Sequence, residues 1–337
     1  MLKISVIIPS FNQGQYIEET LRSVTEQGYP NLELIVIDGA STDQSVDIIR
    51  KYEDRISFWI SEKDKGQSDA INKGFQRATG DIITWLCSDD LFTPGTLHKV
   101  NEHFSSLPTE TGLIHGGVVV FSKAGDDHTD FGYPDPSVER YISGMAFSQP
   151  GAFFRKKYLD LVNGRVSEAL HYGMDYDLFA RLACVCQFKA VPDVYARYRL
   201  HEESKSVSQQ DRFIVDWCRV YFNLCDHLGW TETANLLRSV SPLKDAFSYS
   251  MEHDFSINPS IFEKVDQRKS LFYHLSYQLR ALYAAGNIKD SKRILLFLQK
   301  NYPADWIAEE KRVPYIARKL QLPTLVLLTL RKVKSWI

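Results

Sequence analysis

Two adjacent aspartates, Asp89 and Asp90, end the apolar run DIITWLCSDD. Neighbouring carboxylates repel each other, so the pair is unfavourable unless a cation or a ligand offsets the repulsion. Aspartate oxygens are preferred ligands of hard divalent cations, and such a cation can also bind the oxygens of a diphosphate. Taken alone, the pair is more typical of a solvated loop. The metal-site interpretation therefore depends on the elements that surround the pair.

Short β-branched runs alternate with helical patterns from the start of the chain to this aspartate pair. The runs typical of strands are residues 3–9, 32–38, 56–62 and 81–90. The patterns typical of helices are residues 16–28, 45–52 and 68–80. This alternation predicts βαβ units around a mainly parallel sheet, and the apolar strands predict helices on both faces. The expected fold class is therefore α/β, with a doubly wound sheet.

Polar or aromatic side chains follow each predicted strand, at the sheet edge where ligands bind in such folds. Asp38 ends the second strand and can accept a hydrogen bond from the imide N–H of a nucleobase, while Phe11 offers a flat apolar face. With a cation at Asp89 and Asp90, a base, a ribose and a diphosphate would lie in order along this edge. The first strand is not followed by GxGxxG, and the P-loop motif GxxxxGKS/T does not occur, so these alternatives lack motif support.

In their order and spacing, these motifs resemble the inverting glycosyltransferases of family 2, which have the GT-A fold. The resemblance rests on SVIIPSFNQGQYIEETLRSVTEQGYPNLELIVIDGASTDQSVDII followed by SEKDKGQSDAINKGFQRATGDIITWLCSDD, and it covers about residues 3–201. It implies a GT-A catalytic domain over residues 1–204 that binds a nucleoside diphosphate sugar. It also implies inverting transfer of a hexose-type sugar to a glycan or lipid-linked acceptor, in cell-surface polysaccharide synthesis.

The resemblance also implies donor-binding roles at the strand ends. It implies that Pro9 and Phe11 line the base pocket and that Asp38 binds the base. Asp89 would lie toward the ribose, and Asp90 would bind a divalent metal, Mn²⁺ or Mg²⁺.

Further donor-side residues follow from the same resemblance. In KDKGQSDAINKG, Asp64, Gln67 and Asn72 resemble the polar set that contacts the donor in the family. The family's DDxSxD stretch is DGASTD here, so Gly39 replaces its second aspartate and leaves open how the ribose is held. FSQPGAFFR, with Gln149, resembles the loop that contacts the sugar or the acceptor.

The family's catalytic base lies in an ED motif before a helix, where this chain has GMDYDLFARL. Met174 replaces the glutamate, and the resemblance implies that Asp175 removes the proton of the acceptor hydroxyl. Asp177 is the competing carboxylate, which we expect to face solvent or an arginine such as Arg181. His201, in RLHEESKS, matches a histidine that joins the metal or the diphosphate in relatives; the alternative is a surface histidine on a loop.

Two other classes of function stay open. A nucleotidyltransferase acting on sugar phosphates also uses a sheet edge and a divalent ion. Such an enzyme usually has a Gly-rich loop with a basic residue after its first strand, which SFNQGQY lacks. A non-catalytic nucleotide-sugar-binding or membrane-docking module would bind the donor without releasing diphosphate.

The composition indicates no partner among nucleic acids, because the 337 residues carry a formal net charge of −2. The five cysteines, an odd number mostly inside apolar runs, are typical of reduced thiols in a cytoplasmic protein. The N-terminal apolar run is too short for a signal peptide and has no cleavage site. Elsewhere, no apolar run approaches the roughly 18 residues of a spanning helix.

Residues 205–337 have helical patterns and form the predicted appendage. Residues 267–300 predict a helical hairpin that turns at Gly286 and Asn287. In residues 311–337, basic clusters flank the apolar stretch LPTLVLLTL, and no acidic residue occurs. Such a segment favours peripheral contact with an anionic membrane, here the inner face of the cell membrane. The alternative is a terminal helix that docks on the protein.

Overall fold

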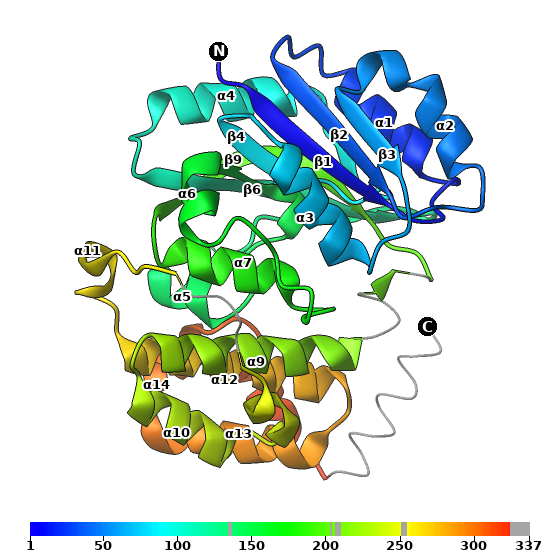
Figure 1. Ribbon diagram of the computed structural model, residues 1–337. Helices are drawn as coiled ribbons and strands as arrows, with labels where there is room; N and C mark the ends of the chain where they lie inside the picture. Colours follow the sequence, from blue (N-terminus) through cyan, green and yellow to red (C-terminus); the bar gives the residue numbers. More distant parts are fainter. Residues whose placement is uncertain (134–136, 203, 206–209, 251–254, 324–337) are drawn as a thin grey trace.

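The computed structural model describes residues 1–133, 137–202, 204–205, 210–250 and 255–323 (Figure 1). An α/β unit occupies the upper part of Figure 1, and a group of helices occupies the lower part. Over the described residues, nine strands form one sheet in the order β3-β2-β1-β4-β8-β6-β9-β5, with β7 paired to β6.

The first four strands are parallel, as the alternating pattern predicts. All seven residues of β1 are buried, because helices cover both faces of the sheet. The register places Ser10 beside Asp38, and Asp38 beside Ser61, at the carboxyl edge of the sheet. These strands are β1 (Ile4–Ser10), β2 (Leu32–Asp38), β3 (Phe58–Ser61) and β4 (Ile82–Trp85).

Beyond β4 the sheet is mixed. β8 runs antiparallel between β4 and β6, β9 runs parallel to β6, and β5 and β7 form antiparallel pairs with β9 and β6. These strands are β5 (Leu91–Phe92), β6 (Thr111–Ser122), β7 (Gly125–Asp130), β8 (Ala152–Arg155) and β9 (Gln187–Arg199).

The strand before the aspartate pair is shorter than the predicted 81–90. β4 ends at Trp85 because the chain then turns, with the Asp90 N–H donating to the Cys87 carbonyl, and enters β5. β5 pairs with the end of β9, where Leu91 lies opposite Arg197. The residues at the end of β9 therefore lie beside the aspartate pair.

Helices on both faces give the predicted doubly wound arrangement. α1, α2 and α4 share one core with Ile4, Val6 and Ile8 of β1, whereas α3, α6 and α7 share the other core with Ile7. Helix α3 ends at Arg77 and not at the predicted Gly80, because the backbone becomes extended after Arg77. The helices are α1 (Ile17–Thr25), α2 (Ser45–Lys51), α3 (Gln67–Arg77), α4 (Thr96–Ser106), α5 (Val138–Ser143), α6 (Lys156–Leu161) and α7 (Met174–Ala183).

The C-terminal region is helical, as predicted. The expected hairpin is α12 and α13, and Gly286 turns the chain with a φ of 84°. The side chain of Asn287 caps α13 by accepting a hydrogen bond from the Asp290 N–H. The helices are α9 (Gln210–His227), α10 (Thr231–Val240), α11 (Pro259–Phe262), α12 (Gln267–Ala284), α13 (Ile288–Asn301), α14 (Ala304–Glu309) and α15 (Val313–Leu320).

The C-terminal helices share a core with the α/β unit. One continuous hydrophobic cluster contains both Ile7 of β1 and Leu320 of α15. At the junction, Ser143 of α5 donates to the Ser270 carbonyl over 2.9 Å, and Nδ1 of His274 lies 2.9 Å from the Ser143 carbonyl oxygen. The domain boundary predicted after residue 204 stays a prediction.

The proposed membrane-surface segment is described only in its first part. Residues 324–337 lie outside the described residues, whereas α15 buries Val313, Ile316 and Leu320 against the protein. This part of the segment therefore docks on the protein, and membrane contact stays a prediction for the rest. Within the described ranges, no helix combines the length and the apolarity needed to cross a bilayer.

Candidate active site

The Asp90 side chain is buried at the exit of β4, with 1% of its surface exposed. Its Oδ1 accepts a hydrogen bond of 2.9 Å from the Arg199 N–H, whereas Oδ2 has no partner among the described residues. Burial, and then the charge of Asp89, raise the pKa of Asp90 well above its usual range. A buried carboxylate oxygen without a partner is unfavourable, and a bound cation would satisfy it.

Three possible ligand groups lie together at this exit. The Cys87 sulfur and carboxylate oxygens of Asp89 and Asp90 all lie within 4.8 Å of one another. Oxygen ligands favour Mg²⁺ or Mn²⁺, and the thiol is the weaker match for such ions. Burial raises the pKa of the Cys87 thiol well above its usual value, so this group favours its protonated form. The two aspartates are therefore the residues that fit a hard divalent cation.

His201 joins the aspartate pair from the chain after β9. Its Nε2 lies 2.9 Å from Oδ2 of Asp89, and its ring packs 4.8 Å from the ring of Tyr16. The structure thus brings His201 to the predicted metal site from 112 residues away along the chain. Its role as a metal ligand stays a prediction, because the contact observed here is with Asp89.

Arg199 is a site residue that the sequence interpretation missed. Its Nε donates to the Asp89 carbonyl over 2.8 Å, and its backbone N–H donates to Asp90. The guanidinium also pairs with Glu19 of α1 and lies over the Tyr16 ring. Arg199 therefore holds the acidic turn in place. The sequence signal was weak, because an arginine two residues before a candidate histidine belongs to no recognised motif.

The predicted base-binding residues lie at the ends of β1 and β2. Phe11 follows β1 and is 59% exposed, so one ring face is open at this edge. Pro9 is buried in β1. Asp38 is fully buried, and its carboxylate accepts hydrogen bonds from the Ser41 N–H and hydroxyl and from the Ser61 hydroxyl. These bonds fix the turn after β2, and base recognition by Asp38 stays a prediction.

Asp64 occupies the space next to Gly39. A Cβ atom at residue 39 would lie 2.7 Å from Oδ2 of Asp64, closer than real contacts allow. The other oxygen, Oδ1, accepts a hydrogen bond of 2.8 Å from the Gly66 N–H. A carboxylate is therefore present beside the end of β2, and it comes from Asp64 and not from residue 39.

The two remaining donor-side residues differ in their surroundings. The Gln67 amide nitrogen lies 3.2 Å from the Cys87 sulfur, and its oxygen accepts a bond of 3.1 Å from Lys205. Asn72 is buried and uses both ends of its amide to bind the backbone of Val166, at 3.0 and 2.9 Å. The structure brings Gln67 to the metal-side group, whereas the contacts of Asn72 favour a role in tying α3 to the segment before α7.

Asp175, the predicted base, lies in the first turn of α7 and is partly buried. Burial raises its pKa to about 6, against the opposing effects of the Tyr176 N–H and the positive charge of Lys205. The competitor Asp177 is fully buried, and Arg181 binds it through two N–H groups at 3.1 and 2.7 Å. The arginine expected beside Asp177 is confirmed, and this ion pair leaves Asp175 as the available carboxylate.

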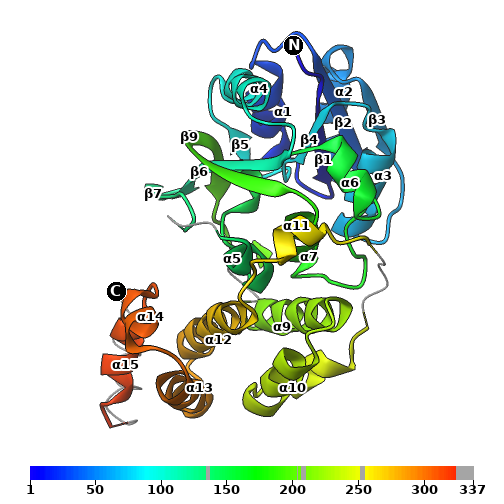
Figure 2. The ribbon, with the colours of Figure 1, turned by 90° about the vertical axis from the view of Figure 1, so that its left-hand side faces the viewer.

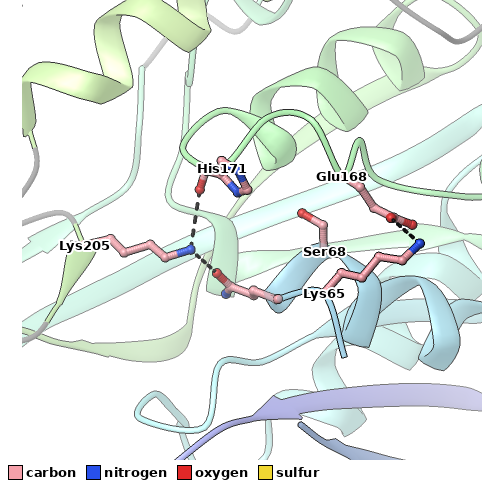
Figure 3. Close-up of a pocket in the computed structure, with 7 residues that line it drawn as sticks. Lys65, Ser68, Glu168, His171 and Lys205 are labelled. Carbon is pink, nitrogen blue, oxygen red and sulfur yellow. Dashed lines mark hydrogen bonds and ion pairs between the residues drawn. The ribbon is translucent and has the colours of Figure 1, made fainter. Parts of the chain in front are cut away.

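A small polar pocket of about 20 Å³ links the donor-side loop to the segment before Asp175 (Figure 3). Lys205 spans it, with Nζ 3.1 Å from the Gln67 amide oxygen and 3.5 Å from the His171 carbonyl. Lys65 pairs with Glu168 across the same pocket at 3.7 Å. Lys205 is a second residue that the sequence interpretation missed, since it lies at the start of the predicted appendage.

The fold is that of the GT-A class. Strands β1 to β4 are parallel, and the acidic pair lies at the carboxyl edge of this part of the sheet. The solved structure of S. aureus TarS 1–349 in complex with UDP-GlcNAc matches with a TM-score of 0.53 and 18% identity. The match covers 83% of this chain and 81% of that chain. The mannosyltransferase PcManGT from Pyrobaculum calidifontis, in complex with GDP-Man and Mn²⁺, matches with a TM-score of 0.57 and 17% identity. That match covers 100% of this chain and 81% of PcManGT. The matches to TarS and to PcManGT confirm the predicted fold.

Comparisons of the amino-acid sequence show which protein family this chain resembles. Residues 5–161 match the family model described as glycosyl transferase family 2. An uncharacterized glycosyltransferase of Rickettsia conorii is 25% identical over 271 residues, 72% of this chain and 44% of the relative. The putative teichuronic acid biosynthesis glycosyltransferase TuaG of Bacillus subtilis is 40% identical over 99 residues, 28% of this chain and 39% of the relative. The chain thus spans less than half the length of these two relatives, and residues 5–161, within its α/β unit, are similar to glycosyltransferase family 2.

Proposed function

We propose that this protein is a metal-dependent, inverting glycosyltransferase. It moves a hexose-type sugar from a nucleoside diphosphate sugar to a glycan or lipid-linked acceptor, in cell-surface polysaccharide synthesis. The observation that carries the proposal is the buried Asp90 carboxylate, which lies beside Asp89 at the donor edge and has one oxygen without a partner among the residues described. The match to the family model favours this reaction over nucleotidyl transfer.

The solved neighbours and one relative support parts of this proposal. TarS is in complex with UDP-GlcNAc, and PcManGT is in complex with GDP-Man and Mn²⁺. TuaG is a putative glycosyltransferase of teichuronic acid biosynthesis. These proteins support a nucleoside diphosphate sugar as donor, a divalent cation and a cell-surface polymer as product. We propose that the reaction takes place in the cytoplasm, at the inner face of the cell membrane.

On the donor side, Asp90 and Asp89 would hold Mn²⁺ or Mg²⁺. When bound, this cation supplies positive charge that stabilises the departing diphosphate. Arg199 positions both aspartates, since it donates to the Asp89 carbonyl and to the Asp90 side chain. Phe11 would stack on the base, and Asp64 is our candidate for the ribose contact that residue 39 cannot make.

On the acceptor side, Asp175 removes the proton of the attacking hydroxyl. The hydroxyl oxygen then forms a bond to the anomeric carbon, the bond from that carbon to the diphosphate breaks, and the anomeric configuration inverts. A carboxylate with a pKa of about 6 is well matched to this task near neutral pH, because it is ionised yet more basic than an exposed aspartate.

A direct test is a screen of nucleoside diphosphate sugars for diphosphate release with and without Mn²⁺. We expect at least one donor to be consumed in a metal-dependent reaction. Asp90→Asn should abolish this release while the thermal unfolding temperature stays within a few degrees of the wild type, because the amide has the same shape and no charge to bind the cation. Asp54→Asn, at an exposed position between α2 and β3, is the matched control. Near-normal turnover in Asp90→Asn would reject the proposed metal site.

A further inference from the structure

A cleft of 1110 Å³ lies between the α/β unit and the C-terminal helices. One wall comes from the segment between β7 and β8, and the facing wall comes from α12 and the start of α15. Figure 2 shows β7, α5, α12 and α15 on the same side of the molecule. The volume exceeds that of pockets for single drug-sized ligands, so the cleft has room for several linked sugar units.

Aromatic rings and cations make up much of the lining. Flat rings pack against the apolar faces of sugar rings and leave the hydroxyls free to form hydrogen bonds. Trp217 lies on α9, and the other rings lie on both walls. The aromatic residues are Tyr133, Phe147, Trp217, Tyr277, Tyr283 and Tyr315.

The charged residues of the described lining are three cations and one carboxylate. The carboxylate, Asp130, already accepts hydrogen bonds from the Ser148 hydroxyl at 2.8 Å and the Gly132 N–H at 2.9 Å. By contrast, Arg280 and Lys311 form no ion pair with any residue that the structure describes, and the same holds for the third cation at residue 312. The excess positive charge favours an anionic ligand.

Two arginines lie beside the Tyr133 ring, and they differ in whether a carboxylate balances their charge. Arg140 lies over this ring at 3.9 Å, and its charge is matched by Glu310 at 2.8 Å. Arg280 lies 5.7 Å from the same ring and 4.3 Å from the Tyr277 ring, and no described carboxylate pairs with it. Its Nη2 has no hydrogen-bond partner among the described residues. The charge of Arg280 interacts with Glu310 only from beyond ion-pair distance, and Glu310 is already paired with Arg140. Arg280 therefore adds positive charge to the cleft wall that no carboxylate among the described residues pairs with directly.

The cleft adjoins both halves of the proposed reaction centre. On the donor side, Ser148 lines the cleft, and the next residue, Gln149, donates to the Trp85 carbonyl at the end of β4 over 2.9 Å. On the acceptor side, Trp217 lines the cleft and packs edge-on against Tyr176, the residue after the proposed base, with ring centroids 6.3 Å apart. The inner end of the cleft is therefore separated from the end of β4 and from the start of α7 by only one layer of buried side chains.

We propose that this cleft binds the acceptor, and that the acceptor is an anionic glycan that bears carboxylate or phosphate groups. The proposal rests on the transferase function above and names the substrate class for it. Trp217, Tyr283 and Tyr315 are the lining rings with accessible surface, and they pack against successive sugars. Lys311 and Arg312, which are exposed, bind the anionic groups together with Arg280. The reacting hydroxyl lies at the inner end, toward Asp175.

Calorimetry with defined oligosaccharides, without a donor sugar, tests whether the protein binds anionic glycans. The probes are a hyaluronan hexasaccharide, its carboxyl-reduced neutral form and a glycerol phosphate oligomer. We expect one or both anionic probes to bind at least about tenfold more tightly than the neutral probe, with a preference that falls as salt rises. The stronger of the two anionic probes identifies carboxylate or phosphate as the recognised group. Equal binding of all three probes, or no binding of any, would overturn the proposal.

The double variant Lys311→Gln, Arg312→Asn removes two cations at the start of α15. Asparagine suits residue 312, because the backbone there has a φ of 64° in the left-handed region. We expect the affinity for the preferred anionic probe to fall about tenfold, and the KM for the acceptor to rise by a similar factor while kcat changes little. Arg280→Gln should act in the same direction. The matched control Lys289→Gln, Arg318→Gln removes the same charge outside the cleft and should leave both constants unchanged.

The transferase function and the cleft assignment can be rejected independently of each other. Metal-dependent release of diphosphate from a donor sugar to water, measured without acceptor, tests the transferase function in the wild-type protein. If that release occurs and the cleft variants still bind and use anionic acceptors as the wild type does, the cleft assignment is wrong. If calorimetry shows the expected anionic preference but no donor is ever consumed, the transferase function is wrong.

Discussion

Asp175 and Asp177 lie two residues apart at the start of α7, and their surroundings differ. Asp177 is fully buried against Arg181, so its charge is matched and it has no access to a substrate. Asp175 is partly buried and forms no ion pair within the part of the chain that the structure describes, and burial raises its pKa to about 6. The same residue type therefore supplies an ion pair inside the protein at one position and our proposed base at the other.

We expect the transfer rate to rise with pH through about 6, because Asp175 must be ionised to accept the proton. A carboxyl group with that pKa is about one-tenth ionised at pH 5 and about nine-tenths ionised at pH 7. The measurement is kcat/KM from pH 5 to 8 at saturating Mn²⁺, with donor affinity followed by calorimetry at each pH. Asp175→Asn should abolish transfer at every pH and keep donor binding. A flat profile between pH 5 and 7 would contradict the assignment, as would loss of donor binding in the variant.

At the scale of elements, the ends of distant strands assemble the donor edge. β4 delivers Asp89 and Asp90, and the pairing of β5 with β9 brings Arg199 and His201 to them. The turn after β2 and the segment after β3 approach so closely that a side chain at residue 39 would have to displace the Asp64 carboxylate, which fills the neighbouring volume. The replacement of the family's second aspartate by Gly39 is thus coupled to the position of Asp64.

A double-mutant cycle tests this coupling. Gly39→Ala alone should weaken donor binding, because its Cβ would lie 2.7 Å from Asp64 and must displace that carboxylate. In the background of Asp64→Ala, the same change at residue 39 should have little further effect. We expect an interaction energy of about 1–3 kcal/mol from donor titrations of the four proteins. Additive effects of the two substitutions would show that Asp64 and residue 39 act independently.

At the scale of the whole molecule, the C-terminal helices complete the core of the α/β unit. Tyr172 donates through its N–H to Asp216 of α9 over 2.9 Å, just before the helix that carries the proposed base. Ser143 of α5 contacts both Ser270 and His274 of α12. Lys205, which contributes to the field around Asp175, also lies at the start of this region. The helices therefore stabilise the segment that presents the base.

We expect a chain that ends at residue 204 to lose cooperative folding, because it would expose the apolar face that α9 and α12 cover. Thermal unfolding followed by circular dichroism, together with size-exclusion chromatography, measures this. The control is a chain that ends at residue 323, which keeps all described helices and should unfold cooperatively as a monodisperse protein. Recovery of a monodisperse 1–204 fragment with a sharp unfolding transition would show that the α/β unit folds on its own.

Patterns of neighbouring residues were enough to predict the helices and strands of the α/β unit and the residues that could do chemistry. Alternation of apolar runs predicted the parallel strands, because strand and helix periodicities depend on neighbours along the chain. The motifs at the strand ends predicted Asp38, Asp89 and Asp90 as site residues, and the family resemblance added Asp175 at the start of a helix. The structure places the aspartate pair beside His201. The roles of these residues stay predictions, but their positions follow from short-range patterns.

The contacts between these groups and the shifts of their pKa values depend on the packing of the whole chain. Arg199 reaches the aspartate pair through strand pairing, and Lys205 reaches Gln67 across 138 residues, so neither contact has a local signal. The electrostatic surroundings of Asp175 likewise include the charge of Lys205, which lies beyond the predicted α/β domain in the chain. Desolvation and charge pairing depend on distances in space, and only packing of the complete chain sets those distances.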